Sequence, residues 1–198
     1  MKIAIFGWGS LVWDTGDLRI VEGNWHKEGP DLPIELSRFS DNRRHLTYVI
    51  DERHARRVPT RYAISTYTDL ENAIADLACR EGCAATRIGY VVADAVDHRA
   101  RRGVPWEDIQ TWVQTAKLDA AIWTDLKYQF PEAWTLDNAV RYWKTRIPAD
   151  ALAEAAKYAS SAPPEVDTDL RRRLIEEGLI ARTGAVEIAD ARLKESKT

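Results

Sequence analysis

The order of apolar and polar positions in the first half of the chain predicts strands. The run at 3–6 is continuously apolar, which favours a buried strand. Segments 34–39 and 45–50 alternate on either side of a polar turn, so together they predict a hairpin. Two further strands are expected at 59–66 and 87–93. The first half is therefore expected to be rich in sheet.

Apolar residues spaced three and four apart predict a helix that ends near Glu81. Residues 68–71, Thr-Asp-Leu-Glu, have the pattern of a capping box at its start, and Gly82 is a typical stop. The segment 14–33 is rich in Gly, Asp and Pro, which predicts an irregular connection. The second half is expected to be mainly helical, with helices at 105–116, 136–146, 149–160 and 170–177. The whole pattern predicts an α+β fold.

Length and composition favour one folded domain. The chain has 198 residues, of which 45% are hydrophobic, enough for a sizeable core. We expect a single domain over 1–186, followed by a charged tail at 187–198 that is free to move. The formal net charge of −3 provides no attraction to nucleic acid or to an anionic membrane. Because no apolar run is long enough for a signal peptide or a membrane span, a cytoplasmic protein is expected, as a monomer or homodimer.

Cysteine and histidine usage argues against a structural metal. The chain has two cysteines, Cys79 and Cys83, near the expected helix end, which supports neither a disulfide framework nor a four-ligand zinc site. The four histidines are scattered and form no pair at metal-ligand spacing. No metal and no other cofactor is therefore expected.

Glu81 is the most informative residue of the expected helix. It falls eleven positions after Leu70 and four after Leu77. At about 100° per residue, eleven steps return to within about 20° of the starting direction, so Glu81 is expected to face the core or a cavity. Burial and the negative end of the helix would both raise its pKa, as a general acid/base near neutral pH requires. In the alternative, the helix frays early and Glu81 turns to solvent, where it pairs with Arg87.

A glycine-rich turn follows the first expected strand, since residues 6–11 read Phe-Gly-Trp-Gly-Ser-Leu. Successive N–H groups in such a turn can form a nest for a substrate carboxylate or a developing oxyanion. The lysine of a Walker loop and the third glycine of the dinucleotide fingerprint are both missing, so nucleotide binding is disfavoured. The alternative is an ordinary tight turn that buries Trp8.

The turn and the helix end together resemble a known family. Residues 6–13, Phe-Gly-Trp-Gly-Ser-Leu-Val-Trp, are similar to the FGYGSL(I)W signature of γ-glutamylcyclotransferase-like proteins, especially the ChaC branch. Residues 77–82, Leu-Ala-Cys-Arg-Glu-Gly, resemble the family's L-x-x-R-E-G segment, whose glutamate is the acid/base. Segments 58–63 and 121–126 also look like bacterial members. The resemblance covers residues 1–95 with some specificity and the helical remainder loosely.

This resemblance implies a fold and a reaction. The fold would be a mixed, partly closed β-barrel-like sheet surrounded by helices. Members of the family cyclise a γ-glutamyl group: the free α-amine attacks the γ-carbonyl, an amine or amino acid leaves, and 5-oxoproline forms. Glu81 would then be the catalytic residue, taking a proton from the α-ammonium and later giving one to the leaving nitrogen. The nucleophile belongs to the substrate, so no cofactor and no Ser-His or Cys-His pair is implied.

The resemblance and the residue pattern together give a set of substrate-binding residues. Trp8 departs from the family pattern, which has Tyr there, and its indole N–H can only donate a hydrogen bond, so substrate preference is affected more than the reaction. Arg38 alternates with Ile34 and Leu36 and is expected to meet a substrate carboxylate, unless it is an edge arginine in solvent. The expected set is Phe6, Gly7, Trp8, Gly9, Ser10, Leu11, Arg38 and Tyr90, of which Tyr90 would otherwise be plain core.

Two other functions compete with the cyclotransferase. A non-catalytic binding protein would use the basic clusters at 53–57 and 99–102 to hold an anionic partner such as RNA, although the net negative charge disfavours nucleic acid. An amidase or another acyl-transfer enzyme on the same scaffold is also open, because a fold does not fix its reaction. The leaving group, whether the Cys-Gly of glutathione, a single amino acid or an amine, is left open by the sequence.

Overall fold

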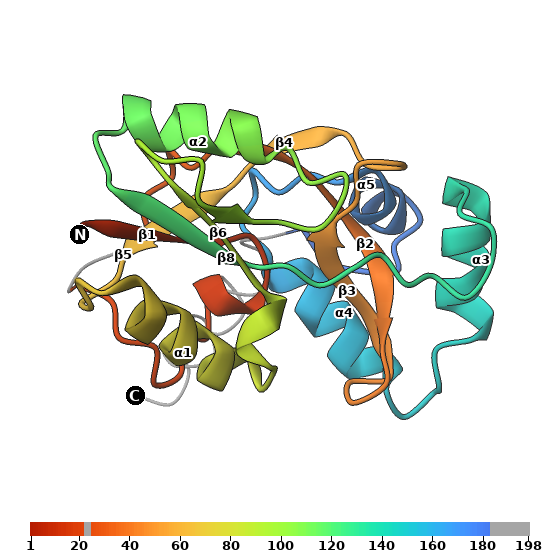
Figure 1. Ribbon diagram of the computed structural model, residues 1–198. Coiled ribbons are helices and arrows are strands. Elements are labelled where there is room, and N and C mark those ends of the chain that lie inside the picture. Colours follow the sequence, from red (N-terminus) through yellow and green to blue (C-terminus); the bar gives the residue numbers. More distant parts are fainter. Residues whose placement is uncertain (22–24, 183–198) are drawn as a thin grey trace, which may run out of the picture.

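The computed structural model of the protein describes residues 1–21 and 25–182, so the predicted charged tail at 187–198 lies outside the described residues. Within these ranges the chain forms two sheets and five α-helices, which confirms the α+β class (Figure 1). The described strands form no closed barrel.

The larger sheet has five strands in the order β5-β1-β8-β6-β7. The first strand β1 pairs in parallel with β8 and antiparallel with β5, and β6 pairs antiparallel with β8. The bounds are β1 Ile3–Gly7, β5 Arg61–Ile64, β6 Ile88–Val92, β7 His98–Arg99 and β8 Ala120–Thr124. The strands predicted at 3–6 and 87–93 are thereby confirmed.

The central strand β8 was not predicted, because the second half was expected to be mainly helical. Four of its five residues are buried, and it lies between β1 and β6 with neighbours on both edges. A strand with both faces buried has no polar alternation, so a five-residue apolar run carries no clear period. Sequence periodicity alone therefore missed the strand that joins the two halves of the sheet.

The smaller sheet has three strands in the order β3-β2-β4, with β2 at Asp31–Ser40, β3 at His45–Ile50 and β4 at Arg57–Pro59. The predicted hairpin is confirmed as β2 and β3, although β2 begins inside the segment that was expected to be irregular. A register shift, typical of a β-bulge, lies between Leu36 and Arg38.

The strand predicted at 59–66 is confirmed as β5, but its predicted start is wrong, because the chain changes sheets there and Pro59 ends β4. Residues Arg57–Pro59 pair with β2, whereas Arg61–Ile64 pair with β1. Between them Thr60 is buried and its hydroxyl donates to the Pro30 carbonyl at 2.7 Å. This bond fixes the crossing point, which sequence alternation does not mark.

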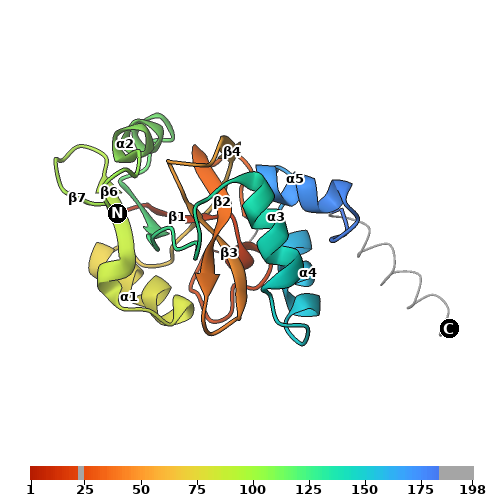
Figure 2. The ribbon, with the colours of Figure 1, turned by 90° about the vertical axis from the view of Figure 1, so that its right-hand side faces the viewer.

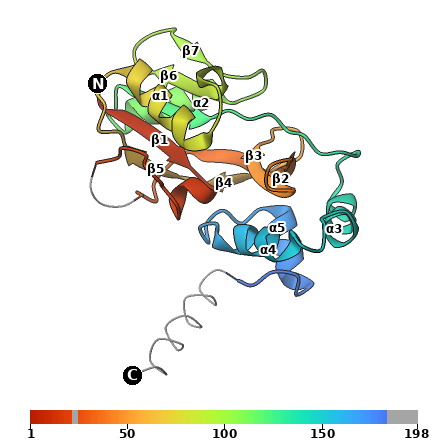
Figure 3. The same cartoon turned by 90° about the horizontal axis from the view of Figure 1, so that it is seen from below.

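The helices cover the two sheets separately. Their bounds are α1 Leu70–Glu81, α2 Trp106–Thr115, α3 Leu136–Thr145, α4 Leu152–Ser161 and α5 Asp169–Glu176. In Figures 1 and 2, α1 and α2 lie on opposite faces of the five-stranded sheet, and α3, α4 and α5 gather beside the three-stranded sheet. Figure 3 shows α4 and α5 below β2 and β3, with α1 on the other half of the molecule.

Residues of β1 alternate between two hydrophobic clusters, as a strand between two helical layers requires. Ile3 and Ile5 pack in the cluster that contains Leu77 of α1, whereas Ala4 and Phe6 pack in the cluster that contains Ile109 of α2. The strand is therefore buried on both faces, and its end is held rigidly at the point where the glycine-rich turn begins.

Helix α1 has well-defined ends that fix the position of Glu81. Its N-cap is Asp69, whose Oδ1 accepts from the Asn72 N–H at 3.0 Å, so the capping box expected to start at residue 68 is wrong by one position. At the other end Gly82 has φ 60°, the left-handed conformation that a helix C-cap favours. The helix therefore runs its full predicted length and does not fray before Glu81.

Gly89 of β6 makes room for Trp123 of β8, and that close approach gives a testable prediction. A Cβ atom added at Gly89 would lie 2.4 Å from the Trp123 indole, which is fully buried and stacks on Phe6 with ring centroids 6.4 Å apart. Replacing Gly89 with Ala is therefore expected to lower the free energy of unfolding by about 1–3 kcal/mol through overpacking. Urea denaturation checks this, and a loss below about 0.5 kcal/mol would show that the indole relaxes freely.

Candidate functional site

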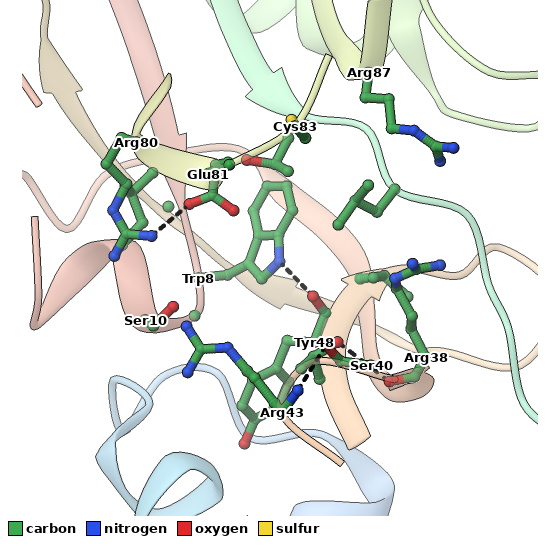
Figure 4. Close-up of a pocket in the computed structure, with 18 of the residues that line it drawn as sticks. Trp8, Ser10, Arg38, Ser40, Arg43, Tyr48, Arg80, Glu81, Cys83 and Arg87 are labelled. Atoms are coloured by element: carbon green, nitrogen blue, oxygen red, sulfur yellow. Dashed lines mark hydrogen bonds and ion pairs between the residues drawn. The ribbon is translucent and has the colours of Figure 1, made fainter. Parts of the chain in front are cut away.

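A cavity of about 660 Å³ brings together parts of the chain that are distant in sequence. It is formed by the turn after β1, the C-terminal end of α1, the β2–β3 hairpin, the end of β8 and one side chain of α4 (Figure 4). Every predicted site residue except Tyr90 lines it: Phe6, Gly7, Trp8, Gly9, Ser10, Leu11, Arg38 and Glu81. The structure therefore places the helix end opposite the glycine-rich turn.

Glu81 is the one carboxylate among the residues that line this cavity. Its side chain is 19% exposed, and its Oε1 accepts from Arg80 Nη1 at 2.8 Å. Burial raises the pKa of Glu81 above its usual range, and the positive charges of Arg80 and Arg43 offset part of that rise. The alternative in which Glu81 turns to solvent and pairs with Arg87 is wrong, because Glu81 faces the cavity and its partner is Arg80.

The turn after β1 presents main-chain groups to the cavity. Residues Ser10–Val12 form one 3-10 turn, closed by the Val12 N–H donating to the Gly9 carbonyl at 3.0 Å. In the described part of the chain, no protein acceptor takes a hydrogen bond from the N–H of Gly9, Ser10 or Leu11. These groups are therefore free to donate to a ligand.

Trp8 is both a buried residue and a cavity wall. It is 5% exposed, and its Nε1–H donates to the Tyr48 carbonyl at 3.4 Å. Because the indole hydrogen is already used by the protein, Trp8 offers a ligand the face and edge of its ring and no free donor. The structure therefore confirms that the turn buries Trp8, and the ligand cradle stays a prediction.

Two tyrosines that sequence reasoning missed lie against the turn. Tyr158 of α4 lines the cavity, and a Cβ atom added at Gly9 would lie 3.0 Å from its hydroxyl oxygen. Burial raises the pKa of Tyr158 to about 12, so its hydroxyl stays protonated and able to donate at neutral pH. Tyr48 of β3 is also buried, and its hydroxyl donates to the Ala159 carbonyl at 3.0 Å. Both residues sit at apolar positions of their elements, so their spacing carried no signal.

Four arginines line the cavity, together with one carboxylate, that of Glu81. The charged side chains around the cavity therefore carry a net positive charge. The arginines are Arg38, Arg43, Arg80 and Arg87, and only Arg38 was predicted as a site residue. Arg38 was expected to follow Ile34 and Leu36 by simple alternation, but the register shift after Leu36 intervenes. Arg38 is half-buried, and its guanidinium donates to Gln129 Oε1 at 2.8 Å.

Tyr90 was predicted as a substrate-binding residue, and the structure places it elsewhere. Its hydroxyl donates to Asp97 Oδ1 at 2.8 Å, and the guanidinium of Arg99 lies 5.1 Å from its ring centroid. Tyr90 does not line the cavity. The face of β6 that carries Tyr90 packs toward α1. There the Tyr90 side chain lies against the hydrophobic cluster that contains Leu77.

The two basic clusters are largely engaged by the protein itself. Arg57 pairs with Asp108, Arg101 pairs with Asp125, and Arg56 pairs with Asp167 and Asp169. Arg99 donates to the carbonyls of Ile88 and Ala85. Carboxylates thus offset the charges of Arg56, Arg57 and Arg101, which weakens the case for the RNA-binding alternative.

Both cysteines lie at the cavity as free thiols, Cys79 exposed and Cys83 half-buried. Burial raises the pKa of Cys83, and the charge of Glu81 acts in the same direction. Across residues 1–21 and 25–182, no group of three His, Cys, Asp or Glu side chains is placed to hold a metal ion. The same ranges contain no helix of the length and apolarity needed to cross a bilayer.

Comparisons with known proteins add no relative, since no family model, no curated protein and no solved structure matches the chain.

Proposed function

We propose that this protein is a cofactor-independent enzyme that cyclises a γ-glutamyl group, with Glu81 as its general acid/base. The observation that carries the proposal is the position of the Glu81 carboxylate in a cavity that Gly9, Ser10 and Leu11 also line, residues whose N–H groups donate to no described protein acceptor. The sequence resemblance to γ-glutamylcyclotransferase-like proteins supports the same reaction, and with it we propose that the chain has the fold of that family.

The chemistry fits the residues present. The Glu81 carboxylate takes a proton from the substrate α-ammonium, and the resulting amine attacks the γ-carbonyl carbon. A new C–N bond closes the five-membered ring, and the carbonyl oxygen carries negative charge that the N–H groups of the turn stabilise. The protonated Glu81 then returns its proton to the leaving nitrogen as the old C–N bond breaks. The attacking nitrogen loses its second proton, which the departing amine takes up, so the products are 5-oxoproline and an ammonium ion, and Glu81 is a carboxylate again.

A panel of γ-glutamyl compounds assayed for 5-oxoproline tests the proposal. The panel contains a γ-glutamyl dipeptide, glutathione and a γ-glutamyl amine, so that it covers the three classes of leaving group. We expect at least one compound to yield 5-oxoproline together with an equal amount of free amine. Release of glutamate in place of 5-oxoproline would assign the site to an amidase instead.

The ion pair between Arg80 and Glu81 predicts a shift in the pH dependence of activity. Glu81 must be deprotonated to accept the first proton, so activity falls as the pH drops through its pKa. Arg80 stabilises the charged carboxylate, and its loss therefore raises the pKa of Glu81 further. The acidic limb of the kcat/KM profile is expected at higher pH in Arg80→Gln than in wild type.

The matched control for this profile is Arg80→Lys, which keeps the positive charge and is expected to leave the acidic limb close to that of wild type. An acidic limb that stays in place, or moves to lower pH, in Arg80→Gln would contradict the role given to the ion pair.

A further inference from the structure

Three of the arginines that line the cavity form no ion pair with any carboxylate of the described residues. Arg80 is paired with Glu81, whereas Arg38, Arg43 and Arg87 form no such pair. A positive pocket without its own counter-charges is suited to an anionic ligand. The arrangement of these three arginines therefore bears on which γ-glutamyl compound the site accepts.

Arg38 is held in place by neutral acceptors. Its Nη1 donates to Gln129 Oε1 at 2.8 Å and to the Lys127 carbonyl at 3.3 Å. These bonds orient the guanidinium and leave its charge uncompensated. Asp41 favours the charged form of Arg38 through space, but Asp41 is not one of the residues that line the cavity. The charge of Arg38 is thus available to a ligand.

Arg87, which ends the 3-10 turn at Ala85–Arg87, lies on the same side of the Trp8 indole as Arg38 (Figure 4), and its positive charge acts on Arg38. Burial, and then the charge of Arg87, hold the pKa of the Arg38 guanidinium below its usual value. One negative charge offsets the repulsion between two guanidinium groups but leaves the three charges with a net charge of +1. A ligand with two negative charges neutralises both guanidinium groups and can pair with each of them.

The two arginines lie away from the reacting end of the cavity. In Figure 4, Glu81 and Arg80 are on one side of the Trp8 indole, and Arg38 and Arg87 are on the other. A γ-glutamyl carbonyl placed at Glu81 would therefore direct its leaving group past the indole toward Arg38 and Arg87. The charge of Arg43 acts on Glu81, so this third arginine belongs to the glutamyl end.

We propose that Arg38 and Arg87 form a subsite for a leaving group that carries two negative charges. This inference rests on the proposed cyclisation and adds the class of substrate to it. Guanidinium groups bind carboxylates and phosphates in the same two-pronged geometry. The shared chemistry is thus a dianion, either the two carboxylates of an acidic amino acid or one phosphate monoester.

Four compounds separate these possibilities by kcat/KM for 5-oxoproline release. γ-Glutamylglutamate and γ-glutamylglutamine have leaving groups of nearly equal size that differ by one charge. γ-Glutamylphosphoethanolamine carries the dianion as a phosphate, and γ-glutamylethylamide has a neutral leaving group. We expect the glutamate compound to exceed the glutamine compound by about tenfold, with the ethylamide slowest. The faster of the glutamate and phosphate compounds identifies the source of the dianion.

Variants of the two arginines connect this preference to the subsite. Arg38→Gln and Arg87→Gln are each expected to reduce the preference for glutamate over glutamine to about threefold or less, mainly through KM. Arg19→Gln removes one charge from an exposed arginine that does not line the cavity, and it is expected to keep the wild-type preference. A preference that survives in both Arg38→Gln and Arg87→Gln would overturn the subsite.

Binding to Glu81→Gln, followed by tryptophan fluorescence, separates a failure of the subsite from a failure of the reaction. If no compound is cyclised but γ-glutamylglutamate binds about tenfold more tightly than γ-glutamylglutamine, the proposed reaction fails and the dianion subsite stands. If 5-oxoproline forms but the two compounds bind and react equally, the reaction stands and the subsite is overturned.

Discussion

Replacing Glu81 with Gln is expected to lower kcat for 5-oxoproline release by at least about a hundredfold, because the amide can neither accept nor return the proton. The change keeps the size of the side chain and one carbonyl acceptor for Arg80 Nη1, which now donates to Glu81 Oε1. Substrate binding is therefore expected to change much less than kcat. Initial rates of 5-oxoproline formation, measured together with substrate binding, check this split.

Glu71 provides the matched control for that experiment. It lies in the first turn of the same helix, is exposed and does not line the cavity. Glu71→Gln is expected to retain wild-type activity. Equal rates in wild type and Glu81→Gln, with Glu71→Gln unchanged, would remove Glu81 from the mechanism.

Replacing Arg171 with Leu is expected to lower the free energy of unfolding by about 3–5 kcal/mol. Arg171 is 2% exposed, and its two terminal nitrogens donate to four backbone carbonyls, those of Ser160, Ala162, Pro163 and Val166. These carbonyls belong to the end of α4 and the connection to α5. Without the guanidinium they would be buried with fewer donors, so α4, which carries Tyr158 to the cavity, is expected to lose its support.

The next residue, Arg172, is the control for this loss. Its side chain is 43% exposed and pairs with Asp167 and Asp169 at the surface. Arg172→Leu is expected to change the free energy of unfolding by about 1 kcal/mol or less. Chemical denaturation of both variants checks the difference, and similar losses in the two would show that Arg171 has no special structural role.

The parts of the fold that could be predicted from sequence are those with a repeating pattern or a definite stop signal. The hairpin of β2 and β3 follows from alternation, and α1 follows from its apolar spacing and from Gly82. Glu81 was found in the same way, because a carboxylate on an apolar helix face is an exception to the pattern.

The parts that could not be predicted depend on contacts between distant segments. Strand β8 has no period of its own, and it becomes a strand because β1 and β6 supply partners on both edges. Tyr158 reaches the cavity only because α4 packs against β3, over a separation in sequence that periodicity does not describe. Arg87 was considered only as a partner of Glu81, since the sequence did not reveal that Arg87 and Arg38 line the same cavity. Tyr90 had a suitable strand position but lies on the face toward α1.

The most direct test of the central claim is the reaction of the wild-type protein with γ-glutamylglutamate in water enriched in oxygen-18. If the substrate α-amine is the nucleophile and Glu81 moves the proton, the product is 5-oxoproline without label, formed in equal amount with free glutamate. Mass spectrometry of the products decides the matter. Labelled glutamate derived from the γ-glutamyl group would show attack by water and would contradict cyclisation at this site.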